Sequence, residues 1–236
     1  MDQDLADLLV KNLGRKYSEI LGINPKPGDD VEIFKWFLAS VLFGAPIAEP
    51  SAVKTYRCFE SRGVLTPRKI LGVGWEGLVD ILDEGGYTRY DFKTSDKLLL
   101  VMKNLTKLYG GSLNLLYQQS LDSSDLESRI RALGKGIGKV TVSIFLRELR
   151  NIWKKADPKP TPLVILAAKN LGIVKEDRPE KALKELGEFW EKNEVAEKSL
   201  VDFETALLRL GKDFCRKGEC RRCILRGYCQ VTSALT

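Results

Sequence analysis

Leu133-Gly-Lys-Gly-Ile-Gly-Lys139 separates two stretches of the chain that have helical periodicity. The first stretch follows Ser124-x-x-Glu127, a capping box that is typical of a helix N-terminus. The second continues from Lys139 to Trp153 with apolar residues at helical spacing. Because glycine adopts tight-turn conformations at little steric cost, residues 123–153 are predicted to form a helix-hairpin-helix.

The glycine turn has the chemistry of an anion site. Gly136 and Gly138 leave backbone N–H groups uncovered next to the predicted N-terminus of the second helix. Lys135 and Lys139 add positive charge on either side of them. This pattern favours binding of a phosphate, although an ordinary helix–turn–helix link with glycine caps would read the same way.

A second motif lies near the C-terminus and reads Cys215-Arg-Lys-Gly-Glu-Cys220-Arg-Arg-Cys223-Ile-Leu-Arg-Gly-Tyr-Cys229. Four thiolates in so short a segment suit zinc or an iron–sulfur cluster. Zinc sites usually have two C-x2-C knuckles, whereas only one such pair is present here. We therefore expect a [4Fe–4S] cluster, with zinc and a pair of disulfides as the alternatives. The fifth cysteine, Cys58, is expected to be a small buried hydrophobe.

Charge and composition narrow the function classes. The chain has 236 residues, a net charge of +6 and no histidine, which excludes Ser-His-Asp and Cys-His chemistry. Arg221 and Arg222 belong to a basic group around the cysteines that suits a phosphate backbone. No apolar run is long enough to span a bilayer, so no membrane partner is expected. Thiolate ligands imply a reducing compartment, and we expect a cytoplasmic, nucleoid-associated protein.

Helical periodicity extends over nearly the whole chain, and strand signals are scarce. A helix is predicted from Val31 to Phe43, after the break at 24–30. Gly72-Val-Gly74 is interpreted as a turn between two of the amphipathic stretches. These stretches lie at residues 3–21, 50–62, 67–71, 75–84, 94–109 and 112–120. The fold class is therefore predicted to be all-α with short links between packed helices.

In combination, the glycine hairpin, the aspartate in Ala156-Asp157-Pro158 and the cysteine loop resemble the helix-hairpin-helix DNA glycosylases of the endonuclease III group. The resemblance covers nearly the whole chain. It implies a two-lobed fold, with a six-helix barrel at 31–151 and an iron–sulfur domain made of 1–30 plus 152–236. It also implies a monomer that binds double-stranded DNA containing damaged or mismatched bases and flips the target nucleotide out of the stack.

The family pattern assigns the catalytic carboxylate to Asp157, which would stabilise the cationic sugar or activate the attacking water. The chain departs from the family's usual valine-aspartate-threonine-histidine run. Counting back from Leu171-Gly172 places the equivalent position on Thr161 instead, and an aspartate before Pro158 is also a common turn or N-cap residue. Both registers remain open.

Bifunctional members of the family carry a lysine two residues after the last hairpin glycine, where it forms a Schiff base with the sugar. Here that position is Val140, and Lys139 stands one residue earlier, about 100° around the helix. A monofunctional glycosylase is therefore expected, with AP lyase activity through Lys139 as the alternative. The gap between Cys215 and Cys220 is two residues tighter than usual, and the x2 and x5 gaps match.

The excised base cannot be read from these residues, but aromatic side chains indicate where it would stack. Tyr87, Tyr90 and Trp153 are the expected walls of the base pocket, although aromatics at helical spacing more often belong to a core. Two other function classes stay open: a DNA lesion-binding module without catalysis, and an iron–sulfur electron carrier.

Overall fold

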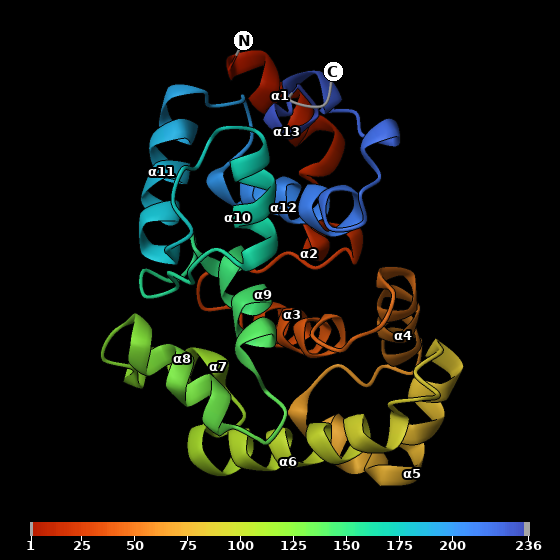
Figure 1. Cartoon of the computed structure of the whole chain (residues 1–236). Coiled ribbons are helices and arrows are strands. Elements are labelled where there is room, and N and C mark those ends of the chain that lie inside the picture. The colour runs from red at the N-terminus through yellow and green to blue at the C-terminus, as the bar shows by residue number, and fades with distance from the viewer. Residues whose placement is uncertain (1, 234–236) are drawn as a thin grey trace. The chain divides into compact units, whose positions relative to one another are not determined.

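The computed structural model describes residues 2–233, with side chains up to residue 231, and almost all regular structure in it is helical (Figure 1). No strand occurs in the described part of the chain, which confirms the all-α prediction. The described helices include none long and apolar enough to cross a membrane. The chain divides into two compact units: a hairpin unit, Ser18–Pro158, and a cysteine unit, Met1–Tyr17 with Lys159–Thr236.

The central helix of the hairpin unit is α3, which packs against α4, α7 and α9 (Figure 1). Asp29 caps α3 by accepting hydrogen bonds from the backbone N–H groups of Val31 and Glu32, at 3.1 and 3.0 Å. The helix is apolar on almost every side and is buried accordingly. The unit contains α3 (Asp30–Phe43), α4 (Glu49–Ser61), α5 (Pro67–Gly85), α6 (Asp91–Tyr109), α7 (Leu113–Gln119), α8 (Ser123–Ala132) and α9 (Lys139–Leu149).

Helices α5 and α6 lie side by side, and α5 also packs on α4 (Figure 1). Helix α5 is broken at Gly74, where φ is 72° and ψ is −177°, so the predicted turn between the 67–71 and 75–84 stretches is confirmed. At its other end, a Cβ at Gly85 would lie 2.1 Å from Oγ1 of Thr55 on α4. Only glycine therefore allows this close approach of the two helices.

The capping box predicted at Ser124 and Glu127 is wrong, because α8 begins after a different N-cap residue. The N-cap is Asp122, whose side chain accepts from the N–H of Asp125 at 2.9 Å. The Asp125 carboxylate in turn accepts from the N–H of Leu121 at 2.8 Å. The reciprocal pair therefore lies two residues earlier, and Ser124 falls inside the first turn.

In the cysteine unit, α12 packs against α1, α10 and α11 around an apolar core. A Cβ at Gly211 would lie 2.1 Å from the carbonyl oxygen of Leu163, so α10 and the end of α12 are in close contact. The unit contains α1 (Asp2–Leu13), α10 (Pro162–Asn170), α11 (Pro179–Lys192), α12 (Leu200–Leu210) and α13 (Gln230–Ser233). Three short turns carry the cysteines: η1 (Gly211–Cys215), η2 (Cys220–Arg222) and η3 (Arg226–Tyr228).

The boundaries between the two units fall after Tyr17 and after Pro158, whereas boundaries after residues 30 and 151 were predicted. Helix α2 (Tyr17–Ile20) spans the first crossing, and Pro158 precedes the second. Side-chain hydrogen bonds hold the extra residues in the hairpin unit: the N–H of Asn24 donates to Glu32 at 2.8 Å, and the Lys155 ammonium donates to the carbonyl of Tyr117 at 3.0 Å. Asp157 therefore belongs to the same unit as the glycine hairpin.

Candidate functional site: the glycine hairpin and the cysteine loop

Two buried apolar residues anchor the turn between α8 and α9. Leu133 ends α8 and is fully buried, and Ile137 is 4% exposed. The N–H of Ile137 donates to the carbonyl of Gly134 at 3.1 Å, which closes the turn. Gly136 and Gly138 alternate with these anchors and are exposed. The turn is thus fixed to the protein on one side and presents glycine backbone to solvent on the other.

Helix α6 forms the floor beneath the turn. Asn104 donates its amide to the carbonyl of Leu133 at 2.8 Å, and a Cβ at Gly134 would lie 2.7 Å from Cγ2 of Val101. Gly136 has φ +95°, and a Cβ there would lie 2.9 Å from Cε of Lys97. Close packing therefore requires glycine at 134, and the left-handed backbone conformation favours it at 136.

The N-terminus of α9 is not capped by a side chain, because Gly138 is its N-cap. The first N–H groups of a helix have no partner within the helix, so those of α9 are available to a ligand. Lys135 and Lys139 are exposed on either side of Gly136 and Gly138. The structure therefore brings together the four residues that were expected to bind a phosphate.

Val140 stands at the position where the sequence analysis looked for a Schiff-base lysine, and its side chain is 59% exposed. It is followed by Thr141, which packs against α3: a Cβ at Gly44 would lie 2.2 Å from the Thr141 hydroxyl oxygen. This contact fixes the rotation of α9. Lys139 is exposed at the first helical position and does not occupy the place of Val140.

Asp157 lies in the irregular segment that follows α9. Arg150 donates from Nη1 to Oδ1 of Asp157 at 2.5 Å and from Nη2 to the carbonyl of Pro158 at 2.8 Å. The Arg150 side chain is 11% exposed, whereas the Asp157 side chain is 45% exposed. The carboxylate is thus held by a buried cation on one side and open to solvent on the other. It does not cap a helix.

Thr161, the other register of the catalytic position, is the N-cap of α10 in the cysteine unit. Its side chain makes no capping hydrogen bond, and its hydroxyl is buried without a partner in the described structure. Asp157 and the start of α10 at Thr161 are therefore four residues apart.

Two of the three expected pocket aromatics are core residues. Tyr87 is 1% exposed, its hydroxyl donates to the carbonyl of Leu42, and burial raises the pKa of its phenol. Trp153 is 2% exposed, stacks on Tyr117 at 4.7 Å and donates to Asn114 at 3.3 Å. In this structure neither ring has a free face on which a base could stack, which corrects their expected role.

Tyr90 is the remaining expected aromatic, and it is half-buried at the N-cap of α6 beside the Arg89 guanidinium. The sequence analysis missed an exposed aromatic pair on α5 and α6. Trp75 and Phe92 are 39% and 56% exposed, and their ring centroids lie 5.1 Å apart. The sequence places Trp75 only in an amphipathic stretch, because helical periodicity does not show which aromatic side chains lie outside the core.

The cysteine loop is anchored to the core of its unit by Leu225, which is fully buried. Short backbone turns set the spacing of the thiols: the N–H of Cys223 donates to the carbonyl of Cys220 at 3.3 Å, and that of Cys229 to Arg226 at 3.2 Å. All four loop cysteines are half-buried free thiols, and Cys58 is a buried free thiol in α4, as predicted. Arg221 and Arg222 are exposed on the same loop.

Two of the loop thiols, Cys215 and Cys223, have raised pKa values. Burial is the main cause that raises the pKa of Cys215, and Cys223, Cys229 and Cys220 add to it in that order. A hydrogen bond with the Asn170 side chain acts in the opposite direction. Burial likewise raises the pKa of the Cys223 thiol. Within residues 2–233, however, no three His, Cys, Asp or Glu side chains are arranged so as to hold a metal ion.

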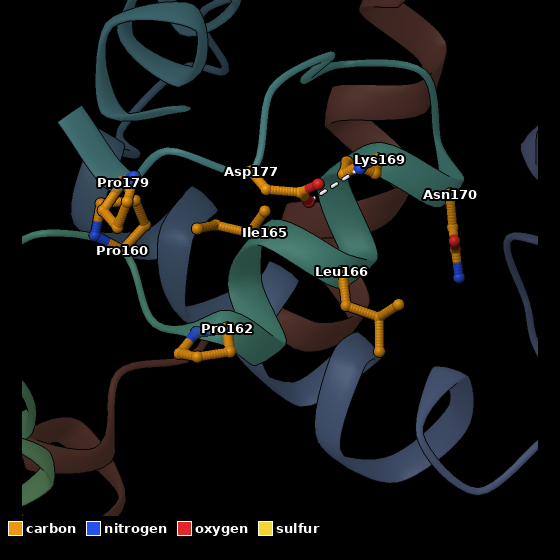
Figure 2. A pocket seen from close by; sticks show the side chains of 8 residues that line it. All are labelled: Pro160, Pro162, Ile165, Leu166, Lys169, Asn170, Asp177 and Pro179. Atoms are coloured by element: carbon orange, nitrogen blue, oxygen red, sulfur yellow. Dashed lines mark hydrogen bonds and ion pairs between the residues drawn. The ribbon is translucent and has the colours of Figure 1, made fainter. Parts of the chain in front are cut away.

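Three cavities lie away from the predicted pocket residues. One, of about 320 Å³, is formed in the cysteine unit by α10 and the residues around it, and an ion pair of 2.7 Å between Lys169 and Asp177 lies in its wall (Figure 2). The wall also includes Asn170, which links it to Cys215. The other two lie in the hairpin unit near the start of α5. None of the three is lined by Tyr87, Tyr90 or Trp153.

Comparison with families of known proteins and with curated proteins found no match. The chain matches no model of a known protein family, and no curated protein is significantly similar to it.

Proposed function

We propose that this chain is a base-excision DNA glycosylase of the helix-hairpin-helix type, which hydrolyses the N-glycosidic bond of a damaged or mismatched base without cleaving the strand. The observation that carries the proposal is the glycine hairpin. Gly136 and Gly138 present backbone to solvent between two exposed lysines, on a turn that Leu133 and Ile137 anchor in the core.

This arrangement suits a DNA backbone phosphate for three reasons. The uncapped N-terminus of α9 supplies N–H donors and the positive end of the helix dipole. Lys135 and Lys139 supply charge that favours DNA of any sequence. Glycine keeps side chains out of the way of the approaching strand. Arg221 and Arg222 would add further phosphate contacts from the cysteine loop.

Asp157 is the proposed catalytic carboxylate. Its half-exposed Oδ atoms can face a substrate, while Arg150 orients the group. As the bond between base and sugar breaks, positive charge develops on the sugar, and a nearby carboxylate stabilises it or takes a proton from the attacking water. Val140 cannot form a Schiff base, which favours water as the nucleophile.

The cysteine loop has the donor set of a [4Fe–4S] site. Cys215, Cys220, Cys223 and Cys229 form no disulfide, are half-buried and lie within one short loop, and four cysteine sulfurs are the ligands that such a cluster takes. Bound there, the cluster would brace the loop and offset part of its positive charge. The basic residues on the loop would then be held in a fixed arrangement toward DNA.

A second candidate function is a DNA lesion-binding module without catalysis. It is favoured by what is found at Asp157 and Thr161, the two candidate positions for the catalytic carboxylate. Asp157 already has a short ion pair with Arg150, and Thr161, at the start of α10, has no carboxylate. A chain with the hairpin but no free carboxylate would bind lesions and leave them intact.

The two functions separate in an assay of duplexes that each carry one damaged or mismatched base, with alkali treatment to reveal base release. We expect release from at least one duplex, and a loss of about 100-fold or more in Asp157→Asn, the scale of general acid–base catalysis. Asp177→Asn is the matched control, since Asp177 is an exposed aspartate that is also ion-paired. Borohydride trapping on the same duplexes should leave Lys139 unlinked to DNA.

Each other outcome changes the assignment. Tight binding without release from any duplex supports the binding module. Release that is equal in Asp157→Asn and Asp177→Asn removes Asp157 from the chemistry. Absence of DNA affinity at low salt rejects both functions.

A further inference from the structure

Lys97 of α6 lies directly behind the hairpin turn. Its Cε is 2.9 Å from the position that a Cβ on Gly136 would take, and its Cδ and Cγ are 3.5 and 3.7 Å away. The aliphatic part of the side chain therefore occupies the space that any larger residue at 136 would need. The stem ends beside the glycine at which the backbone of the turn is open to solvent.

The ammonium group of Lys97 has no partner in the described structure. No hydrogen bond or ion pair joins it to another described residue, in contrast to the cation Arg129 of α8, which pairs with Asp125 at 2.8 Å. Burial lowers the pKa of Lys97, because removing the charged form from water is unfavourable. The Lys97 Nζ is not among the buried side-chain atoms that lack a partner, so solvent and an approaching anion can reach the charge.

We propose that Lys97 is a DNA-phosphate ligand of the hairpin, which donates its ammonium to the same backbone phosphate as the N–H groups at Gly136 and Gly138. This inference rests on the proposed function. It adds a cation from a separate helix to a site that the sequence confines to residues 135–139.

Packing alone does not require a lysine at this position. The stem fills the space behind Gly136, and an uncharged chain of similar length would fill it as well. The ammonium is the part that is costly in the unbound protein and favourable beside a phosphate. Because the aliphatic stem of Lys97 fills space and its ammonium carries the charge, a substitution that keeps the stem and removes the charge tests the inference.

Lys97→Met keeps a long unbranched side chain and removes the charge. The matched control is Lys103→Met, which changes an exposed lysine on the same helix, roughly 120° around its axis. Binding of an undamaged duplex oligonucleotide would be measured from 50 to 300 mM salt for both variants, and for Lys97→Arg, which retains the charge.

In Lys97→Met we expect about tenfold weaker binding at 0.1 M salt, as befits loss of a charge-assisted hydrogen bond. The slope of log affinity against log salt should flatten by about one, for one lost phosphate contact. Lys97→Arg should recover the slope of the unaltered protein. The midpoint of thermal unfolding of Lys97→Met should be unchanged or higher, since a merely structural lysine would leave a less stable variant.

Equal affinity and equal salt slope in Lys97→Met and Lys103→Met would overturn the inference while leaving the proposed function intact. Weaker binding together with a lower unfolding midpoint would assign Lys97 a structural role and overturn it too. A protein that binds no duplex DNA in any form would reject the proposed function and this inference with it.

Discussion

At the scale of single residues, Arg150 and Lys97, two cations of the hairpin unit, differ in how their charges are paired. Arg150 is a buried cation that meets a carboxylate and a carbonyl, so its desolvation is compensated within the protein. Lys97 is half-buried and meets no anion among the described residues. Salt bridges such as Arg57–Glu60 and Arg62–Glu84 join exposed groups, and such pairs contribute little to stability. The Lys97 charge therefore lies beside the glycine turn without a partner among the described residues, where a phosphate would pair it.

The lowered pKa of Lys97 predicts a pH dependence of DNA binding. A bound phosphate favours the charged ammonium, whereas the free protein loses this proton at a lower pH than an ordinary lysine. Affinity should therefore fall as pH rises into the alkaline range, and the fall should begin earlier than in Lys97→Met, which has no proton to lose there. Duplex binding at constant ionic strength between pH 7 and 10 measures this difference. Parallel curves for the two proteins would contradict it.

The lowered pKa of Lys97 also determines how the stability of the free protein changes with pH. Because the folded-state pKa of Lys97 is below that of the unfolded chain, the unfolded chain binds more protons in the interval between the two values. Stability of the free protein therefore rises with pH across that interval, and below it the full cost of the unpaired charge is present. This is the physical reason why removal of the charge should not weaken the fold.

At the scale of elements, close helix contacts position both motifs. Glycine at 134 lets α6 approach the hairpin turn, and glycine at 211 lets α10 approach the segment that leads into the cysteine loop. In the loop itself there is little regular structure beyond η1, η2 and η3. Leu225 is the fully buried side chain that connects the loop to the core of its unit, and Phe214, Cys215, Cys223 and Tyr228 pack against the same core while partly buried.

Leu225→Ala should destabilise the cysteine unit and loosen the loop. Leu225 is fully buried, and truncating such a leucine costs about 2–5 kcal/mol through lost contacts and the cavity left behind. Ile224→Ala is the matched control, because Ile224 is the adjacent residue and is 43% exposed. Urea unfolding gives the free-energy change, and iron content after anaerobic reconstitution reports on the loop. Similar stability and iron content in the two variants would show that Leu225 does not anchor the loop.

At the scale of the whole molecule, the two units have separate cores and are joined by two chain crossings. The four proposed metal ligands all lie in the cysteine unit, and the glycine hairpin lies wholly in the other. A ligand that binds only the folded state stabilises what it contacts, so metal should act first on the cysteine unit.

Metal removal should accordingly affect the tryptophans unequally. Trp190 is in the cysteine unit, whereas Trp36, Trp75 and Trp153 are in the hairpin unit. With fluorotryptophan incorporated, chelation of reconstituted protein should shift and broaden the fluorine resonance of Trp190 and leave the other three nearly unchanged. Substitution of Cys220 by alanine should reproduce the effect. A uniform response of all four signals, or none in either protein, would count against a metal confined to the cysteine loop.

Local signals in the sequence determined the helices, the break at Gly74, the glycine turn and the spacing of the thiols. These features depend on periodicity, backbone freedom and residue order within a few turns, which a single stretch of chain contains. The start of α8 shows the limit of such signals: Asp122 and Ser124 are both good N-caps, and the choice fell to Asp122 because Asp125 reaches back to Leu121.

Tertiary structure alone decided which of these residues meet. It buried Tyr87 and Trp153, joined Arg150 to Asp157, assigned residues 18–30 to the hairpin unit and brought Lys97 of α6 beneath Gly136. Lys97 and Gly136 are 39 residues apart, and no pattern in either stretch refers to the other. Contacts of this kind follow from the packing of whole helices, so the charge that approaches the glycine turn from behind could be found only in the folded chain.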